Sequence, residues 1–406
     1  MKISQIYYIF LSFIKLIFSL PINEFSMQYI ISIRIKNKQD LNFLLDTTKS
    51  YSIFFSDTNK NGYNNLPNNY FSDFITSIEI NTFNIRNFKF KIENDNTNLN
   101  NQKIQGIIGL GIKDYRNSLL DRMKEEKIIK KRIIFFLNKP SPKIYFQNEI
   151  SKRINEKYLG CYINSQSNKL IIMNKNYSES WNCDLNYIYI ENKEKYNKNI
   201  FNNGSKIENY ISINDTIKVN SKVIFDAKSY YITTSVKYLD IILNEFNSTK
   251  KCSPFYFDNY YFISCNINEE KLKNIPFICF ILDGYCFKIK GENLFIKNKR
   301  DIYYSLIRFS NNSEYDNIFI LGYPFFSSYK IKFDYDNNFI GFLGDEEPIN
   351  FKKILKEFNI KFDIVKFVGI SGIIIVSIIL FIFCIKNCIM NDKSKSHIKF
   401  IDEVNY

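Results

Sequence analysis

Residues 320–342 read ILGYPFFSSYKIKFDYDNNFIGF, and this stretch decides the fold. It opens with two apolar residues and a glycine, and the same short pattern occurs as IIG at residues 107–109. Upstream of each copy an apolar run ends in an aspartate, FLLD at residues 43–46 and VIFD at residues 223–226. The two aspartates lie 226 − 46 = 180 positions apart. This coarse internal repeat predicts a duplicated chain whose halves each contribute one carboxyl group.

The two aspartates, Asp46 and Asp226, point to one kind of chemistry. Two carboxyl groups in contact cannot both ionise cheaply, so they share one proton. One of them then acts as a base on a bound water molecule while the other acts as an acid. The repeat therefore predicts a site formed by two halves of the chain around a carboxyl pair.

Four segments of the chain resemble the pepsin-like aspartic protease family. Residues 320–342 are similar to the family's C-terminal signature, and QGIIGLG at residues 105–111 is similar to the family's DGILGLG. WNCDLNYIYI at residues 181–190 resembles the strand that leads into the second lobe. The segment from Cys265 to Gly284 resembles a cysteine, proline and Asp-Gly segment of that lobe.

The resemblance covers about residues 24–347 and implies a mostly β, bilobal acid protease fold with a few short helices. It implies an N-terminal β lobe at residues 24–183 and a C-terminal β lobe at residues 184–347. Asp46 and Asp226 would be the catalytic pair, supported by the two glycines Gly109 and Gly322. The resemblance also implies a monomer that takes a peptide or protein as substrate or ligand and needs no cofactor.

Local patterns agree with a β protein. Apolar and polar residues alternate at residues 29–35, 77–85 and 88–92, as strands require. One helix is predicted after Ser118, where Ser118 to Asp121 form a capping-box pattern. A second helix is predicted after Thr234 or Ser235, with its apolar face made by Val236, Leu239, Ile242, Leu243 and Phe246.

The family's catalytic motif, Asp-Thr/Ser-Gly, is altered in both halves, to DTTK at residues 46–49 and DAKS at residues 226–229. In the family the glycine lets the chain pass close to the carboxylates, so Thr48 and Lys228 are expected to crowd the site. The family's paired hydroxyl groups brace the two loops against each other. Thr47 keeps one of these hydroxyls and Ala227 has none, so the brace is expected to be one-sided.

Two interpretations of Lys228 stay open. If its ammonium group lies within about 5 Å of the carboxyl pair, the attraction is roughly 3 kcal/mol at an effective dielectric of 20, equivalent to about two pKa units. Both carboxyl groups would then ionise and the shared proton would be lost. Alternatively, the side chain extends into a cleft or solvent and has little effect.

The segment that covers the substrate in this family is short here. Between Phe55 and Phe74 lie 18 residues, and Tyr63 and Tyr70 are the candidates left for the tyrosine of the family's closing hairpin. Without that hairpin, exclusion of water and ordering of substrate would both suffer. The first predicted strand also leaves no room for the family's inhibitory pro-segment.

Histidine and charge exclude other classes of function. The single histidine, His397, lies near the C-terminus, which excludes serine or cysteine catalysis with histidine and a histidine metal site in the main body, and we expect no metal. Apolar residues make up 45% of the chain, enough for a large core. The net charge is +14, but the lysines are scattered rather than clustered, so we expect no nucleic-acid binding.

The two ends of the chain predict a membrane protein. Residues 1–20 have the layout of a signal peptide, with an uncleaved anchor as the alternative because Lys15 interrupts the apolar run. Residues 367–385 form an uncharged apolar stretch of spanning length, preceded by a stem at 348–366 and followed by a cytoplasmic tail at 386–406. This predicts a single-pass type I protein of the secretory pathway or cell surface, with both lobes outside the cytosol.

Cysteines and sequons fit export. The predicted exported part contains six cysteines, which suggests up to three disulfides with fifteen possible connectivities. These candidates are Cys161, Cys183, Cys252, Cys265, Cys279 and Cys286. Sequons for N-glycosylation occur at Asn176, Asn203, Asn214, Asn247 and Asn311. Cys384 and Cys388, beside the predicted span, are either apolar filler or acylation sites.

Three functions remain open on the sequence. The altered motifs favour a pseudoprotease that binds an extended peptide or a protein in its cleft without cutting it. The retained carboxyl groups favour an active endopeptidase that uses Asp46 and Asp226 at acidic pH. A receptor or scaffold that works through the basic tail is the third reading.

Overall fold

The computed structural model describes fourteen parts of the chain. They are residues 29–35, 40–56, 73–80, 83–94, 104–112, 118–137, 143–146, 158–163, 180–190, 216–246, 251–298, 302–345, 348–351 and 377. The chain divides into two compact units, residues 1–349 and 350–406, and both aspartates of the repeat lie in the first unit. The predicted signal peptide lies outside the described residues, as do the sequons other than Asn311 and all but one residue of the predicted span.

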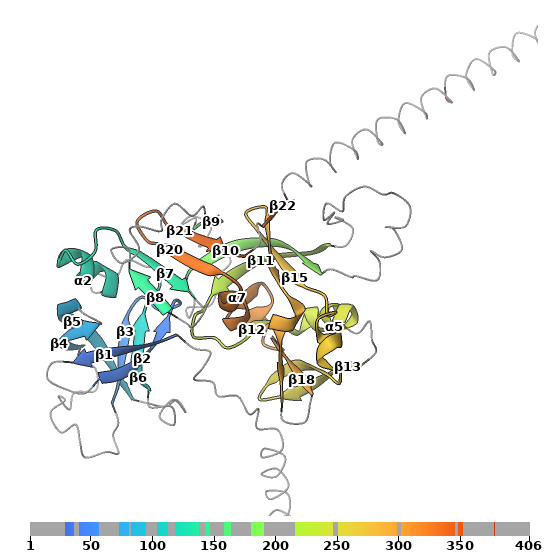
Figure 1. Ribbon diagram of the computed structural model, residues 1–406, viewed down its shortest axis with the longest axis horizontal. Helices are drawn as coiled ribbons and strands as arrows, with labels where there is room; N and C mark the ends of the chain where they lie inside the picture. Colours follow the sequence, from blue (N-terminus) through green and yellow to red (C-terminus); the bar gives the residue numbers. More distant parts are fainter. Residues whose placement is uncertain are drawn as a thin grey trace, which may run out of the picture. The chain divides into compact units, whose positions relative to one another are not determined.

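The first sheet is a closed barrel built from the first third of the chain (Figure 1). Its strands, in the order in which they pair, are β1 (Ile30–Ile35), β2 (Asp40–Asp46), β6 (Ile104–Gly109), β3 (Ser52–Ser56), β5 (Phe83–Asn94) and β4 (Asp73–Ile80). The predicted run 77–85 is not one strand, because β4 ends at Ile80 and this residue pairs with Phe83, the first residue of β5.

The second sheet has eleven strands, which come from residues 182–350. Ten of them follow one another in the order β13 (Cys252–Phe257), β14 (Tyr260–Cys265), β18 (Tyr303–Ser310), β12 (Ile232–Ser235), β19 (Ile318–Leu321), β11 (Thr216–Phe225), β10 (Asn182–Ile190), β15 (Ile278–Leu282), β16 (Tyr285–Ile289) and β22 (Ile349–Asn350). The eleventh, β17 (Phe295–Lys297), pairs with β18.

The third sheet joins distant parts of the sequence. Its order is β8 (Lys143–Phe146), β7 (Ile133–Leu137), β20 (Lys330–Asp334), β21 (Phe339–Leu343) and β9 (Leu159–Tyr162). Figure 1 shows the two strands of the C-terminal stretch lying beside strands of the first half. Residues 330–343 therefore fix the later half of the chain to the earlier half.

Both predicted helices are confirmed. Helix α2 (Leu119–Glu125) begins after Ser118, whose hydroxyl accepts a hydrogen bond from the backbone of Asp121. The second begins after Ser235 with a 3₁₀ turn, η6 (Val236–Tyr238), and continues as α5 (Leu239–Phe246). Among the described residues, further helical segments are α6 (Glu269–Leu272), η8 (Gly291–Leu294), η9 (Ser313–Tyr315) and α7 (Tyr323–Ser328).

Aromatic side chains fill the core around the C-terminal stretch. The ring of Phe325 in α7 lies 5.1 Å from that of Phe342 and 5.6 Å from that of Phe225, which directly precedes Asp226. Trp181 is fully buried, and its indole Nε1 donates a hydrogen bond to the carbonyl oxygen of Leu110 at 2.9 Å. These contacts hold the ends of the two aspartate strands against one shared core.

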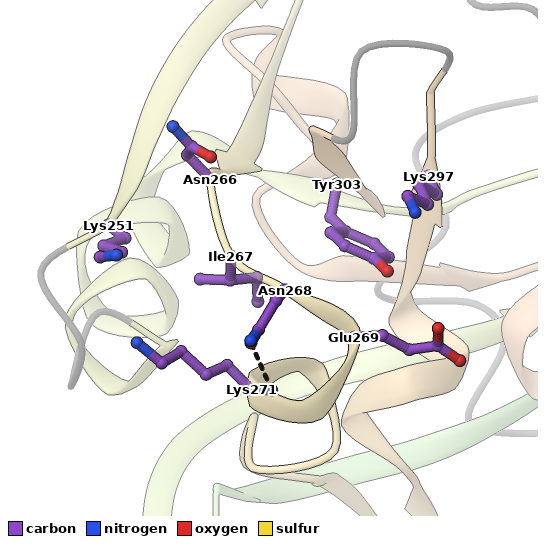
Figure 2. A pocket seen from close by; sticks show the side chains of 8 residues that line it. All are labelled: Lys251, Asn266, Ile267, Asn268, Glu269, Lys271, Lys297 and Tyr303. Atoms are coloured by element: carbon purple, nitrogen blue, oxygen red, sulfur yellow. Dashed lines mark hydrogen bonds between the residues drawn. The ribbon is translucent and has the colours of Figure 1, made fainter.

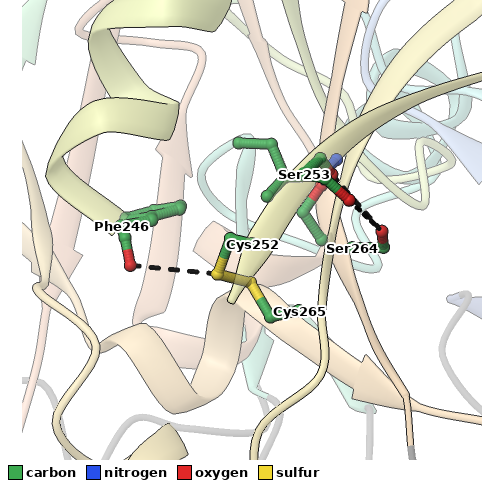
Figure 3. Close-up of a disulfide and its surroundings, with 7 residues drawn as sticks. Phe246, Cys252, Ser253, Ser264 and Cys265 are labelled. Atoms are coloured by element: carbon green, nitrogen blue, oxygen red, sulfur yellow. Dashed lines mark hydrogen bonds between the residues drawn. A yellow bond between two sulfur atoms is a disulfide. The ribbon is translucent and has the colours of Figure 1, made fainter. Parts of the chain in front are cut away.

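All six candidate cysteines are paired. The disulfides are Cys161–Cys183, Cys252–Cys265 and Cys279–Cys286. Figure 3 shows the second of these, which joins the neighbouring strands β13 and β14 next to the C-terminal end of α5.

Within the described residues, no helix combines the length and apolar character that a membrane span requires.

Candidate active site

The internal repeat is visible in the pairing of strands. Strand β2 runs parallel to β6, with Asp46 opposite Gly109. Strand β11 runs parallel to β19, with Phe225 opposite Leu321, which sets Asp226 and Gly322 at the next position. Each aspartate thus ends a strand that pairs with the strand of its own apolar-apolar-glycine motif.

The two motif glycines are required by close approach of the backbone. A Cβ atom on Gly109 would lie 2.2 Å from the carbonyl oxygen of Tyr51, in the loop that follows Asp46. A Cβ atom on Gly322 would lie 2.4 Å from the carbonyl oxygen of Ser229, in the loop that follows Asp226. Any larger residue would push the aspartate loop away from its strand.

Thr47 braces the two aspartate loops against each other. Its hydroxyl donates to the carbonyl oxygen of Phe225 at 2.6 Å and accepts from the backbone N–H of Ala227 at 3.0 Å. The methyl side chain of Ala227 returns no hydrogen bond. One hydroxyl therefore ties the loops directly before and after Asp226, which sets the two aspartates near each other.

The residues that replace the family's glycines keep the backbone contact to the carboxylates. The N–H of Thr48 donates to Oδ1 of Asp46 at 2.8 Å, and the N–H of Lys228 donates to Oδ1 of Asp226 at 3.1 Å. The hydroxyl of Thr48 adds a further hydrogen bond to Oδ1 of Asp46. Neither residue has a positive φ, so the backbone conformation at these positions does not require glycine.

Lys228 lies in the site rather than in solvent. Its ammonium Nζ is 2.7 Å from Oδ2 of Asp46, an ion pair between the two halves of the repeat. The Asp46 side chain is fully buried, whereas one third of the Lys228 side chain is exposed. Both carboxylate oxygens of Asp46 are thus bound by the protein. The second oxygen of Asp226 has no hydrogen bond within the described part of the chain.

The environment separates the acidities of the two aspartates. Burial alone raises the pKa of Asp46, but the charge of Lys228 and the hydrogen bonds from Lys228 and Thr48 outweigh it, so the pKa lies below its ordinary value. Burial raises the pKa of Asp226 to about 6, against the charge of Lys228 and with the help of the charge of Asp46. The charge of Lys228 lowers the pKa of both aspartates, as the first interpretation of this residue expects, but at Asp226 burial outweighs it.

Lys228 itself remains charged. Burial lowers its pKa, but the carboxylates of Asp226 and Asp46 more than offset that effect and raise the pKa above its usual value. In mildly acidic solution the site therefore holds an ionised Asp46, a protonated Asp226 and a cationic Lys228.

Two residues that the sequence analysis did not single out shift the pKa values of Asp226 and Lys228. The charge of Arg308, from β18, lowers the pKa of Asp226, and its guanidinium lies 4.2 Å from the centre of the Tyr260 ring. Tyr51, after Asp46, acts on the pKa of Lys228, and its ring carries Lys91 Nζ at 3.5 Å from its centre. Neither stands in a recognisable motif. Tyr63 and Tyr70, the candidates for the closing hairpin, lie outside the described residues.

Comparisons with known proteins identify the family to which this chain belongs. A family model described as eukaryotic aspartyl protease matches residues 69–343, a range that contains Asp226 but not Asp46. The crystal structure of the aspartic proteinase from Irpex lacteus matches with a TM-score of 0.54 at 12% identity, over 78% of this chain and 94% of that chain, and this likeness shows the fold. A comparison with curated protein sequences gives no significant match. With more than half of its length matched by the family model, the chain belongs to the eukaryotic aspartyl protease family.

Proposed function

We propose that this protein is a membrane-anchored pseudoprotease that binds an extended peptide or a protein segment without cutting it. The observation that carries the proposal is the Lys228 Nζ at 2.7 Å from Oδ2 of Asp46. Hydrolysis by a carboxyl pair needs one carboxylate that holds a water molecule and accepts its proton. Lys228 occupies that carboxylate and lowers its basicity, so water activation is suppressed.

Binding, unlike cleavage, is compatible with the charges at the site. Protonated Asp226 has a carboxyl oxygen without an internal partner and is able to donate a hydrogen bond to a peptide carbonyl group. Because the pKa of Asp226 is about 6, this donor exists in mildly acidic solution and is lost at higher pH. Peptide affinity is therefore expected to fall as the pH rises through 6.

The test compares binding and cleavage by the purified full-length protein. We expect no cleavage of denatured protein substrates between acidic and neutral pH. A peptide that mimics the transition state should bind no tighter than an ordinary extended peptide, because the site does not stabilise that state. Cleavage that Asp46→Asn and Asp226→Asn both abolish would overturn the proposal. As a positive control, the double variant Thr48→Gly/Lys228→Gly frees Asp46 and should regain slow cleavage.

An active endopeptidase is the second candidate. The observation in its favour is the split between the pKa values of Asp46 and Asp226, one lowered and one raised, which a working carboxyl pair also has. It requires Lys228 to leave Asp46 when substrate binds, and the partial exposure of its side chain gives it a route. Wild-type turnover at acidic pH that Lys228→Met leaves unchanged or increases would favour this candidate.

Membrane anchoring and export rest on the sequence of residues 1–20 and 367–385. They place the β domains outside the cytosol in a single-pass type I arrangement. Asn311 offers a direct test, because it is an exposed sequon residue directly after β18. Expression in eukaryotic cells should give a form that an endoglycosidase shortens, and Asn311→Gln should remove part of that shift. A protein without any sugar, recovered in the soluble fraction, would contradict the arrangement.

A further inference from the structure

A pocket of about 420 Å³ lies on the second sheet at the start of β18 (Figure 2). Tyr303 connects the segments that line the pocket, because this residue pairs with Cys265 of β14 on one side and with Lys297 of β17 on the other. The volume falls within the range typical of small-molecule sites. Nothing in the aspartyl protease chemistry uses it.

Within the residues that the structure describes, the hydroxyl of Tyr303 has no hydrogen-bond partner. The residue is 4% exposed, and its side chain lines the pocket. Within the described part of the chain this hydroxyl makes no hydrogen bond. The hydroxyl is not among the fully buried polar atoms that lack a partner, so it is accessible from the pocket and available to a ligand.

The charge of the pocket is positive. Three lysines line it, Lys251, Lys271 and Lys297, against one acid, Glu269. Within the described residues neither Lys251 nor Lys271 forms an ion pair. Ammonium groups that gather around one concave surface raise the local concentration of anions. The pocket therefore favours a ligand that carries more than one negative charge.

The backbone that lines the pocket is held rigid before any ligand binds. Lys251 and Asn266 flank the disulfide Cys252–Cys265, and the N–H of Asn266 donates to the carbonyl oxygen of Lys251 at 3.0 Å. Ile267, which is 6% exposed, supplies an apolar surface between them. A site held by a disulfide and strand pairing loses little freedom when a ligand binds.

From these features we infer that the pocket binds a phosphorylated polyol of about the size of an inositol or sugar phosphate. A bare phosphate ion would leave most of the volume unfilled, since a water molecule occupies about 30 Å³ and a phosphate only a few times more. The lysines suit the phosphate groups, the Tyr303 hydroxyl and the Asn266 amide suit ring hydroxyls, and Ile267 suits the carbon face of the ring. A free phosphorylated polyol and the headgroup of a phosphoinositide lipid share this chemistry.

Calorimetric titration of the full-length protein with inositol 1,4-bisphosphate tests the inference. Lys251→Gln and Lys271→Gln should each weaken binding by about tenfold, as expected for a hydrogen bond to a charged group. Tyr303→Phe should weaken it by about fivefold, because it removes only the hydroxyl and leaves the buried ring in place. Lys218→Gln, on the exposed part of β11, removes the same charge outside the pocket and is the matched control.

Each outcome decides the question. Weakening by the three pocket variants, with Lys218→Gln at wild-type affinity, would support the site. Absence of binding at millimolar ligand, or equal weakening by Lys218→Gln, would overturn it. Inorganic phosphate that binds as tightly as the bisphosphate, with no effect of Tyr303→Phe, would overturn the assignment to a polyol. The source of the ligand is tested by flotation with vesicles that contain phosphatidylinositol 4-phosphate. If vesicle binding is weakened by the same variants, the ligand is the lipid headgroup. If the protein binds only the soluble ligand, the ligand is the free polyol.

Discussion

Lys228 Nζ and Asp46 Oδ2 lie 2.7 Å apart, although the two residues are 182 positions apart in the chain. Asp46 is fully buried, so its charge depends on this partner and on the hydrogen bonds from Thr48. A buried carboxylate that loses its partner is strongly destabilising, whereas the pair itself contributes little to stability. The main effect of the ion pair is therefore to hold Asp46 ionised and in place at the site, rather than to stabilise the fold.

We predict that Lys228→Met lowers the free energy of unfolding at neutral pH by roughly 2 to 3 kcal/mol. This is less than the 3 to 5 kcal/mol typical of a fully buried pair, because one third of the lysine side chain is exposed. Urea unfolding of wild type, Lys228→Met, Asp46→Asn and the double variant measures it. The double variant should recover most of the loss. Additive effects of the two single changes would show that the contact carries no coupling.

The raised pKa of Asp226 predicts how stability depends on pH. Its folded-state pKa is about 6 and its ordinary value is 3.8, so the folded protein holds this proton more tightly than the unfolded chain. Stability from Asp226 is fully present below pH 4 and is lost as pH rises through 6, a change of about 3 kcal/mol for about two units. Asp46 has the opposite sign, because its lowered pKa adds stability that is lost only in stronger acid.

Urea unfolding at several pH values between 4 and 7 checks this dependence. Asp226→Asn should remove the decline between pH 4 and 6 and leave the loss in stronger acid. If the unfolding free energy of Asp226→Asn declines between pH 4 and 6 as much as that of wild type, the decline belongs to other titratable groups.

Thr47→Val should destabilise the protein by about 2 kcal/mol. The change keeps the shape but removes the hydroxyl that serves both Phe225 and Ala227, so that a carbonyl oxygen and an N–H are left buried without partners. The reverse change, Ala227→Ser, offers a second hydroxyl to the same loops and should be neutral or slightly stabilising. Thermal unfolding of both variants measures the brace. If Ala227→Ser lowers the stability more than Thr47→Val does, residue 227 has no room for a hydroxyl and the brace is not limited by its missing hydrogen bond.

The sequence predicted the features that depend on local patterns. Strands that end in Asp46 and Asp226 can be predicted because alternation and the apolar-apolar-glycine motif are written in short stretches. The helix after Ser118 and the helix after Ser235 were predicted for the same reason, since a cap lies next to the helix it starts.

Contacts between residues that are distant in the sequence could not be predicted from it. A lysine side chain has many rotamers, and only the position of Asp46 shows where that of Lys228 points. Arg308 reaches the region of Asp226 because β18 pairs with β12, a pairing that no short motif encodes. That the φ of Thr48 is compatible with any residue likewise could not be read from the sequence.

The three disulfides are predicted to differ in their contribution according to the length of chain that each closes. Cys161–Cys183 closes 22 residues and Cys279–Cys286 only 7, so the chain-entropy model assigns them about 3 and about 2 kcal/mol. The longer one also joins β9 of the third sheet to β10 of the second, next to the buried Trp181. Its loss should therefore loosen the connection that holds the two halves of the carboxyl pair.

Paired serine variants of each disulfide measure this difference. Cys161→Ser/Cys183→Ser should lower the unfolding free energy more than Cys279→Ser/Cys286→Ser does and should also flatten the pH dependence assigned to Asp226, because a looser site lets water reach that carboxyl group. The shorter hairpin keeps its strand pairing and its Asp283-Gly284 turn, in which both residues have positive φ, without the bridge. A larger loss from the shorter disulfide would mean that strain or unfolded-state structure, rather than loop length, sets the contribution of these bonds.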